Sequence, residues 1–356
     1  MSEKKTLTMR DIAKAAGVSA ATVSLVLNGK GEISSATRAK VLDVVADLNY
    51  VPRPPRPRLG EAVNDTLRFL KIAKHGHTVN RDHSHFISDY IDGMSQEAMR
   101  RGYTLEVVSH EREAIATIAQ SLAGTGIKGV VALGTELSEA DMRLLLTSGI
   151  PTVFIDTFHE VIDANFVNMN NEDAVYKVLS RLKLLGFRDI GFVASPVETT
   201  NFRLRRDAFE KNMHRLDLPF SEANTIWVES TFDGAYEASL RHIVAGGRLA
   251  DCYFCTNDVM AYGFIKALRE NNIRIPGDVS IIGFDNLPMS ATMDPPLTTI
   301  EVSKRKIGYL AITILDDLIN ASEQQPSVKI LVGADLVVRA SDRRLRRRRD
   351  GGAEGR

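Results

Sequence analysis

Hydrophobic positions follow two different patterns along the chain. In the first fifty residues they recur at the spacing of one helix face, as at Val41, Val44, Val45 and Leu48. From residue 66 onward, short apolar runs alternate with amphipathic helical stretches such as 174–187 and 259–272. The predicted strands are residues 66–73, 103–110, 128–134, 151–156, 189–195, 224–229, 250–256 and 279–285. This alternation predicts parallel α/β sheets with helices on both faces.

Three short helices are predicted in the first fifty residues. Thr8 stands in the capping position of a helix that ends at Gly17. After a turn of a few residues, Ser19 caps a second helix over 20–27, and Ser34 caps a third. Two helices joined by a tight turn, with a supporting helix behind them, form the helix-turn-helix layout that presents its second helix to the major groove.

The residues of this segment have a specific resemblance. The run TMRDIAKAAGVSAATVSLVLNGKGEISSATRAKVLDVVADLNYVP resembles the headpiece of the LacI/GalR (lactose-repressor) family of bacterial transcription factors. Further along, NDVMAYGFIKALRENNIRIPGDVSIIGFDN and PPLTTIEVSKRKIGYLAITIL resemble the periplasmic-binding-protein-like core of the same family. The resemblance extends from the headpiece to about residue 340.

The resemblance implies an all-α helix-turn-helix headpiece followed by an α/β body of two Rossmann-like lobes. We expect the headpiece at 1–51, a Pro/Arg-rich linker at 52–65, the body at 66–340 and a basic tail at 341–356. The chain crosses between the lobes three times in this family. We therefore expect the first lobe at about 66–164 and 297–326, and the second at about 165–296 and 327–340. A (β/α)8 barrel is the alternative architecture for the body.

Residue by residue, the resemblance also assigns DNA contacts. The base-reading positions hold Ala20, Ala21 and Leu25. Alanine can contact a thymine methyl group but cannot form the paired hydrogen bonds that read G or A. The positions that hold the phosphate backbone are Thr8, Ser19, Thr22, Ser24, Asn28, Thr37 and Tyr50. Each of these could equally be a helix cap or a solvated surface residue.

The linker departs from the family pattern. Family members place a hinge helix here and insert a leucine into the minor groove. Counting without gaps puts Leu59 at that position, but Pro55 and Pro57 would break the helix. An extended chain can instead place arginines along a narrow minor groove. Our hypothesis is that the groove and its phosphates are contacted by Arg53, Arg56 and Arg58. A stiff, solvated spacer is the alternative.

Ligands of open α/β sheets bind beyond the carboxyl ends of the strands, and several polar residues follow predicted strands there. The candidates that meet both this rule and the family motif are Arg205, Asn257 and Asp285, with Asp156 on geometry alone and Phe232 as an approximate match to a stacking aromatic. Such groups hydrogen-bond ligand hydroxyls or carboxylates. An interdomain or capping role is the alternative for each polar residue, core packing is the alternative for Phe232, and Asp258 could be the cap of the next helix.

Residues 74–86 contain four of the eight histidines. One interpretation is an anionic effector, such as a sugar acid or phosphorylated sugar, held near His75, Arg81 and Phe86. A metal site is a second possibility, although the spacing matches no known ligand motif. A polar surface loop is the third.

The formal net charge of zero is the sum of unlike segments. Residues 1–60 carry 10 basic and 5 acidic side chains, and residues 341–356 carry 7 and 3. The middle of the chain carries 28 and 37. Basic ends and an acidic body are the distribution expected of a protein that meets DNA through its ends only.

Compartment and chemistry are constrained by what the sequence lacks. Two cysteines are too few for a disulfide framework, and Cys252 and Cys255 fall inside a predicted strand, where core packing explains them. No apolar run reaches the roughly 18 residues that span a bilayer, and the first residues lack a signal-peptide core. We expect a bacterial cytoplasmic, nucleoid-associated protein without a metal or cofactor.

Together these features favour a transcriptional regulator, in the first instance a repressor. It would bind a pseudo-palindromic double-stranded operator as a homodimer, and a small effector, a sugar or sugar acid, would change the angle between its lobes. A cytoplasmic sugar-binding module is an alternative that leaves the headpiece unexplained. A sugar-metabolising enzyme is a weaker one, because the sequence shows no nucleophile–base pair, phosphate loop or metal motif.

Overall fold

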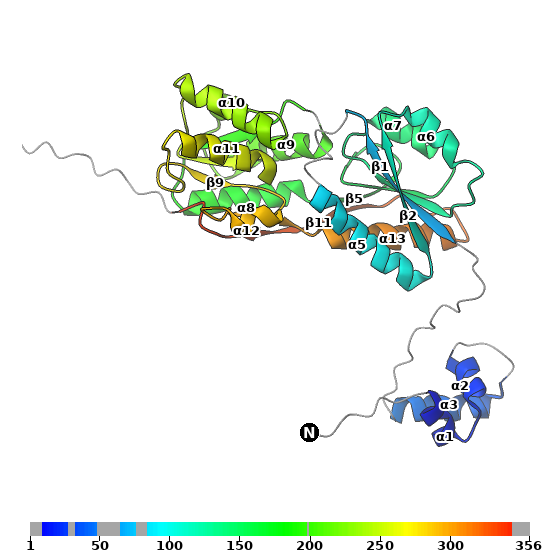
Figure 1. Cartoon of the computed structure of the whole chain (residues 1–356). Coiled ribbons are helices and arrows are strands. Elements are labelled where there is room, and N and C mark those ends of the chain that lie inside the picture. The colour runs from blue at the N-terminus through cyan, green and yellow to red at the C-terminus, as the bar shows by residue number, and fades with distance from the viewer. Residues whose placement is uncertain (1–8, 28–32, 48–64, 76–83, 198, 344–356) are drawn as a thin grey trace, which may run out of the picture. The chain divides into compact units, whose positions relative to one another are not determined.

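The computed structural model describes residues 9–27, 33–47, 65–75, 84–197 and 199–343. The chain divides into two compact units, residues 1–62 and 63–356, which are described separately (Figure 1). None of the helices in the described ranges is long and apolar enough to cross a membrane.

The first unit contains three helices. Their bounds are α1 Met9–Ala16, α2 Ala20–Leu27 and α3 Ser35–Asp47. Gly17 follows α1 with a φ of +63°, a conformation that glycine adopts without strain. Ser19 Oγ accepts the Thr22 amide at 3.0 Å and so caps α2. A small core holds the three helices together through Ile12, Ala13, Ala16, Val23, Val26 and Val41. The helices expected from the sequence are therefore present.

The second unit begins with a six-stranded parallel sheet of strand order β11-β5-β4-β3-β1-β2. The strands are β1 Thr66–Ala73, β2 Thr104–Glu111, β3 Gly129–Leu133, β4 Thr152–Ile155, β5 Asn165–Met169 and β11 Lys329–Val332. The helices are α5 Ser84–Arg101, α6 Ile115–Leu122, α7 Glu139–Leu146 and α13 Lys304–Asn320. In Figure 1, α5 and α13 lie on one face of this sheet, and α6 and α7 on the other. We call this part the first lobe.

Alternation along the strands explains the two covered faces. Phe69, Val131 and Val153 pack in the core that includes α5 and α13, whereas Leu70 and Phe154 pack in the core under α6 and α7. Successive side chains of a strand point to opposite faces, so a strand buried on both sides needs an almost unbroken apolar run. Such apolar runs are the basis on which β1, β3 and β4 were predicted.

A four-stranded parallel sheet of order β7-β6-β8-β9 forms the second lobe. Its strands are β6 Ile190–Ala194, β7 Thr225–Trp227, β8 Cys252–Cys255 and β9 Ser280–Ile282. Its helices are α8 Asn171–Leu184, α9 Thr200–Arg215, α10 Phe232–Val244, α11 Asp258–Glu270 and the short α12 Pro288–Thr292, with a 3-10 turn at Glu222–Asn224. Cys252 and Cys255 are free thiols in this core, and burial raises the pKa of both, which keeps them unreactive.

Three of the expected boundaries are wrong. Residues 165–169 and 329–332 were assigned to the second lobe, but they are β5 and β11, which pair with each other in the sheet of the first lobe. The chain therefore crosses after each of these strands instead of before it. Residues 341 and 342 were assigned to the tail, but both are buried against the second lobe, where the Ser341 hydroxyl donates to the Ile281 carbonyl oxygen at 2.7 Å.

Two of the crossing segments pair with each other. They are β10 Thr299–Val302 and β12 Ala334–Val337, which form a two-stranded antiparallel sheet. β10 leads from the second lobe into α13, and β12 leads back from β11. Both therefore lie where the relative position of the lobes is set.

Candidate functional site

Polar side chains gather where the carboxyl ends of strands from the two lobes meet. Asp156 follows β4 of the first lobe, while Asn257 and Asp285 follow β8 and β9 of the second. Arg205 lies in the second turn of α9, which follows β6 of the second lobe. All four side chains are buried, so other protein groups must satisfy their charges and dipoles.

Arg205 is held on every side. Its Nε donates to Asn171 Oδ1 at 3.0 Å, and its Nη1 donates to the Thr256 carbonyl oxygen at 2.8 Å. Its Nη2 lies 3.6 Å from Asp285 Oδ1, and the guanidinium stands 3.7 Å from the ring centre of Phe284. Burial lowers the pKa of Arg205 and neighbouring carboxylates oppose this shift, so the group stays a fixed cation.

Asp156 joins the two lobes. Its φ of +59° is left-handed, and its carboxylate accepts hydrogen bonds from the Tyr90 hydroxyl at 3.0 Å, the Asn201 amide at 3.0 Å and the Thr135 hydroxyl. Tyr90 and Thr135 belong to the first lobe, whereas Asn201 lies on α9 of the second. Burial raises the pKa of Asp156, although the Thr135 and Tyr90 hydroxyls and the charge of Arg205 oppose the shift. The carboxylate therefore ties the second lobe to the first.

A second link between the lobes is made by a side chain of the first lobe that reaches the second. Lys304 begins α13 of the first lobe, is buried, and donates through Nζ to the backbone oxygen of Asp285 at 2.8 Å. The same Nζ lies 3.3 Å from Glu301 and 3.9 Å from Asp89 on α5. The Asp285 carboxylate therefore forms an ion pair with Arg205 of its own lobe, and the Asp285 carbonyl oxygen accepts a hydrogen bond from Lys304 of the first lobe.

Two other candidates have structural roles in the second lobe. Asn257 has no exposed surface, and its Oδ1 accepts the Met260 amide at 2.9 Å, which makes Asn257 the cap of α11. The capping role that the sequence left open for Asp258 therefore belongs to its neighbour. Phe232 begins α10, and its ring centre lies 5.8 Å from Lys266 Nζ of α11. Phe232 therefore packs beside α11.

The histidine-rich segment is described only at its ends. Phe86 is buried and meets the Tyr90 ring edge-on at 5.1 Å, which brings it to the interlobe contact. His75 is exposed, and its backbone N–H donates to Glu136 at 2.7 Å. Arg81 lies outside the described residues. Within the described ranges, no three His, Cys, Asp or Glu side chains are arranged to hold a metal ion.

The DNA-contact candidates of the first unit are partly described. Ser19, Ala20 and Leu25 are exposed on and before α2, and Thr22 and Thr37 are half-buried. Ala21 and Ser24 lie on α2, but their side chains are outside the description. The candidates beyond the described residues are Thr8, Asn28, Tyr50, Arg53, Arg56, Arg58 and Leu59. The exposed side chains agree with a helix that presents this face to a partner.

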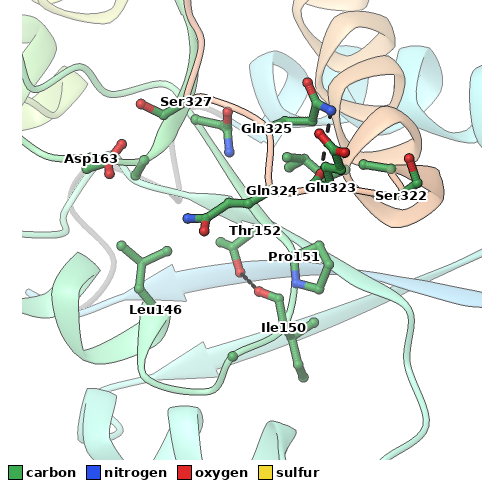
Figure 2. Close-up of a pocket in the computed structure, with 15 residues that line it drawn as sticks. Leu146, Ile150, Pro151, Thr152, Asp163, Ser322, Glu323, Gln324, Gln325 and Ser327 are labelled. Atoms are coloured by element: carbon green, nitrogen blue, oxygen red, sulfur yellow. Dashed lines mark hydrogen bonds between the residues drawn. The ribbon is translucent and has the colours of Figure 1, made fainter.

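A separate polar groove of about 590 Å³ lies at the amino ends of strands β4 and β5 of the six-stranded sheet (Figure 2). It is lined by the start of β4 at Thr152, the start of β5 at Asn165 and residues 321–325 after α13. Thr152 Oγ1 donates to the Ile150 carbonyl oxygen there at 2.8 Å. Because the groove borders the amino ends of the strands, it is distinct from the predicted effector site at their carboxyl ends.

Comparison with known proteins identifies the family. Residues 8–53 match the family model of bacterial regulatory proteins, lacI family, and residues 179–341 match a periplasmic binding protein-like domain. The HTH-type transcriptional repressor PurR of Pasteurella multocida (strain Pm70) is 30% identical over 340 residues, which cover 94% of this chain and 98% of that protein. The chain belongs to the lacI family of bacterial regulatory proteins. It is a DNA-binding transcriptional regulator and not an enzyme.

Solved structures confirm the predicted fold of this lacI-family regulator. The transcriptional regulator CelR–cellobiose complex has a TM-score of 0.68 at 23% identity and covers 94% of this chain and 99% of its own. The lac repressor dimer bound to operator and the anti-inducer ONPF has a TM-score of 0.69 at 23% identity. The match covers 95% of this chain and 100% of the lac repressor chain. The expected helix-turn-helix domain with a two-lobed, periplasmic-binding-protein-like body is therefore correct.

Several residues of the interlobe contact in this lacI-family regulator were not predicted from the sequence, among them Thr135 and Asn168. Others are Tyr90, Asn201 and Lys304. Asn201 could have been found, because it lies in the first turn of α9, just beyond the carboxyl end of β6. Tyr90 and Lys304 carried no such signal, since each is an ordinary helix position whose partner lies far away in sequence.

Proposed function

We propose that this lacI-family repressor binds its operator as a homodimer and releases or retains it according to a small molecule bound between the lobes. The buried contact of Arg205, Asp285, Asp156 and Asn201 supports this proposal most directly. It combines paired donors and acceptors at the carboxyl ends of strands from both lobes, which is where open α/β proteins bind ligands. Such a regulator works in the cytoplasm on the nucleoid, and we propose that location.

The charges of this contact favour a neutral, polyhydroxylated effector, a sugar, over a sugar acid. Two buried carboxylates, Asp156 and Asp285, stand beside one guanidinium, Arg205. The ammonium of Lys304 donates to the Asp285 carbonyl oxygen and is balanced by the carboxylates of Glu301 and Asp89. An anionic effector would bring a third negative charge into a region of low dielectric constant, where repulsion is strong. Hydroxyl groups can donate to the carboxylates and accept from Arg205 at the same time. CelR, of similar fold, is described in complex with cellobiose.

The same contacts suggest how an effector would act. A ligand hydroxyl that bonds to Asp156 competes with the amide of Asn201, and so changes the link between the lobes. A changed interlobe angle alters the spacing of two headpieces in a dimer, and hence their fit to two half-sites. Because the two binding events are linked, operator and effector change each other's affinity by the same factor.

For the headpiece, we propose that Ala20, Ala21 and Leu25 face the bases. The exposure of Ala20 and Leu25 supports this assignment. The hydroxyl and amide residues Ser19, Thr22, Ser24, Asn28, Thr37, Thr8 and Tyr50 would contact phosphates. Apolar base contacts of this kind favour sites with thymine methyl groups in the major groove.

A thermal-shift screen of the full chain tests the effector proposal, since a bound ligand stabilises by mass action. Neutral sugars, sugar acids, phosphorylated sugars and nucleobases are compared on the native chain, on Asp285→Asn and on a control, Asp233→Asn, which alters an exposed residue of α10. We expect neutral sugars to raise the melting temperature of the native chain and the control only. If only sugar acids raised the melting temperature, the proposal of a neutral sugar effector would be wrong.

A gel-shift assay on genomic fragments tests the operator proposal. We expect sequence-specific retardation by the full chain, with a stoichiometry of two chains per site. A compound that stabilises in the thermal screen should change the retarded fraction. A stabilising compound that leaves operator affinity unchanged would contradict effector control, because linkage requires a change in both directions.

A further inference from the structure

Asp258 is a buried carboxylate that sequence analysis treated only as a possible cap. It is the first residue of α11 and has no exposed surface. Its Oδ1 accepts the Thr299 hydroxyl at 2.6 Å, and its Oδ2 accepts the Ser290 hydroxyl at 2.6 Å and the Leu287 amide at 2.9 Å. One side chain thereby joins α11, the turn after β9, α12 and the crossing strand β10.

The turn that Asp258 holds has an unusual backbone. Asp285 and Asn286 have φ values of +109° and +48°, in the region that non-glycine residues rarely adopt. Such residues persist only where the surroundings fix them. Asp258 forms hydrogen bonds to the residues before and after this turn. Its N–H donates to the Phe284 carbonyl oxygen at 2.8 Å, and its carboxylate accepts the Leu287 N–H.

Close packing restricts where the Asp258 carboxylate can lie. A Cβ atom added at Gly283 would lie 2.1 Å from Asp258 Oδ1, so the absence of a side chain there makes the room that Asp258 occupies. The Tyr262 hydroxyl lies 2.7 Å from Ser290 Oγ and supports that donor from the next turn of α11. Packing at Gly283 and the Tyr262–Ser290 hydrogen bond therefore both fix the position of the Asp258 carboxylate.

We propose that Asp258 is a positioning residue of the effector site: it holds the 285–287 turn so that the Asp285 side chain faces Arg205 and its carbonyl group receives Lys304 from the first lobe. This inference rests on the proposed function for its biological meaning. Asp258 itself is enclosed by protein donors, so it acts through Asp285 and not by contact with an effector. It would couple the occupied state of the site to β10, the strand that leads into the first lobe.

Protonation offers a readout that a purely structural role would not affect. Burial raises the pKa of Asp258 to about 7, and the nearby charge of Asp285 adds to this effect. The other titratable or charged groups that interact with it are Arg205 of α9, Cys255 of β8 and Tyr262 of α11. The charge of the group that holds Asp285 in place therefore changes near neutral pH.

The test follows the Arg205 Nε–H resonance in the ligand-free full chain by ¹⁵N NMR between pH 6 and pH 8. The resonance is assigned by its loss in Arg205→Lys. In the native chain and in the control Asp233→Asn, we expect it to move with pH. In Asp258→Asn, we expect a displaced resonance that no longer moves, together with at least tenfold faster amide exchange over residues 284–292.

Thr299→Val provides a second variant, because it removes one donor to Asp258 and keeps the side-chain volume. We expect a smaller displacement of the same resonance. An Arg205 resonance unchanged in both variants, even with faster exchange over 284–292, would show a merely structural role and overturn the proposal. These readouts need no effector, so their outcome is independent of the thermal-shift screen: that screen can fail while Asp258 still positions Asp285.

Discussion

The hydroxyl of Tyr90 and the amide of Asn201 donate to the same carboxylate oxygen of Asp156, each at 3.0 Å. Tyr90 comes from the first lobe and Asn201 from the second. Burial raises the pKa of Tyr90, and the adjacent Asp156 charge adds to the shift, so the phenol remains a donor at physiological pH. One oxygen atom of Asp156 thus accepts a donor from each lobe, beside the separate link from Lys304 to the Asp285 carbonyl oxygen.

We expect Tyr90→Phe to lower the free energy of unfolding by about 1–3 kcal/mol, because a buried acceptor loses a hydrogen bond. Urea unfolding of the full chain measures the change. Tyr176→Phe on α8 is the matched control, since Tyr176 is 38% exposed, and it should alter stability much less. Equal losses in the two variants would contradict a special role for the Tyr90 hydroxyl.

The crossing of α5 and α13 gives a second prediction. A Cβ atom at Gly308 would lie 2.3 Å from the Tyr90 carbonyl oxygen, so the helices meet through backbone at this point. We expect Gly308→Ala to cost about 1–3 kcal/mol through overpacking and to disturb Tyr90. Thermal unfolding provides the measurement. Gly333→Ala, where no atom lies within 4 Å of the added carbon, should be nearly neutral.

Asp258 makes stability depend on pH in a defined direction. Its folded-state pKa of about 7 lies above its ordinary value of 3.8, so the folded chain binds more protons in that interval. Stability from this group is therefore present at low pH and is lost as the pH rises through about 7. The contribution of Asp258 is the free energy of unfolding of the native chain minus that of Asp258→Asn. We expect this difference, measured by urea unfolding, to fall between pH 5 and pH 8. A difference that rises with pH would contradict the assignment.

For the linker, we expect replacement of its three arginines by alanine to weaken operator binding and to flatten its salt dependence. Each lost phosphate contact should reduce the slope of log K against log salt by about 0.9. Gel shifts across a salt series measure both quantities. Arg241→Ala, an exposed position on α10, is the control. An unchanged slope would leave the linker as a spacer.

Local sequence signals predicted most of the fold, since every strand expected from an apolar run is present. β5 escaped because NFVNM carries two asparagines, and Asn168 uses its side chain to donate to Asn201 at 2.8 Å instead of adding to an apolar run. Arg205, Asp285 and Asp156 were predicted from strand ends and family motifs, and the structure brings them together. Their partners Tyr90 and Lys304 could not be predicted, because tertiary packing alone brings these helix positions to the site.

The pairing of β5 with β11 has a consequence for how the chain is made. Residues 329–332 leave the ribosome more than 150 residues after β5, yet they form the outer strand that covers it. Until then, the nascent first lobe carries an open backbone edge on an apolar parallel sheet, which is an aggregation hazard. The second lobe is synthesised during this interval. Chains that terminate before residue 329 should therefore depend on chaperones or be degraded, even though their headpiece and most of both lobes are complete.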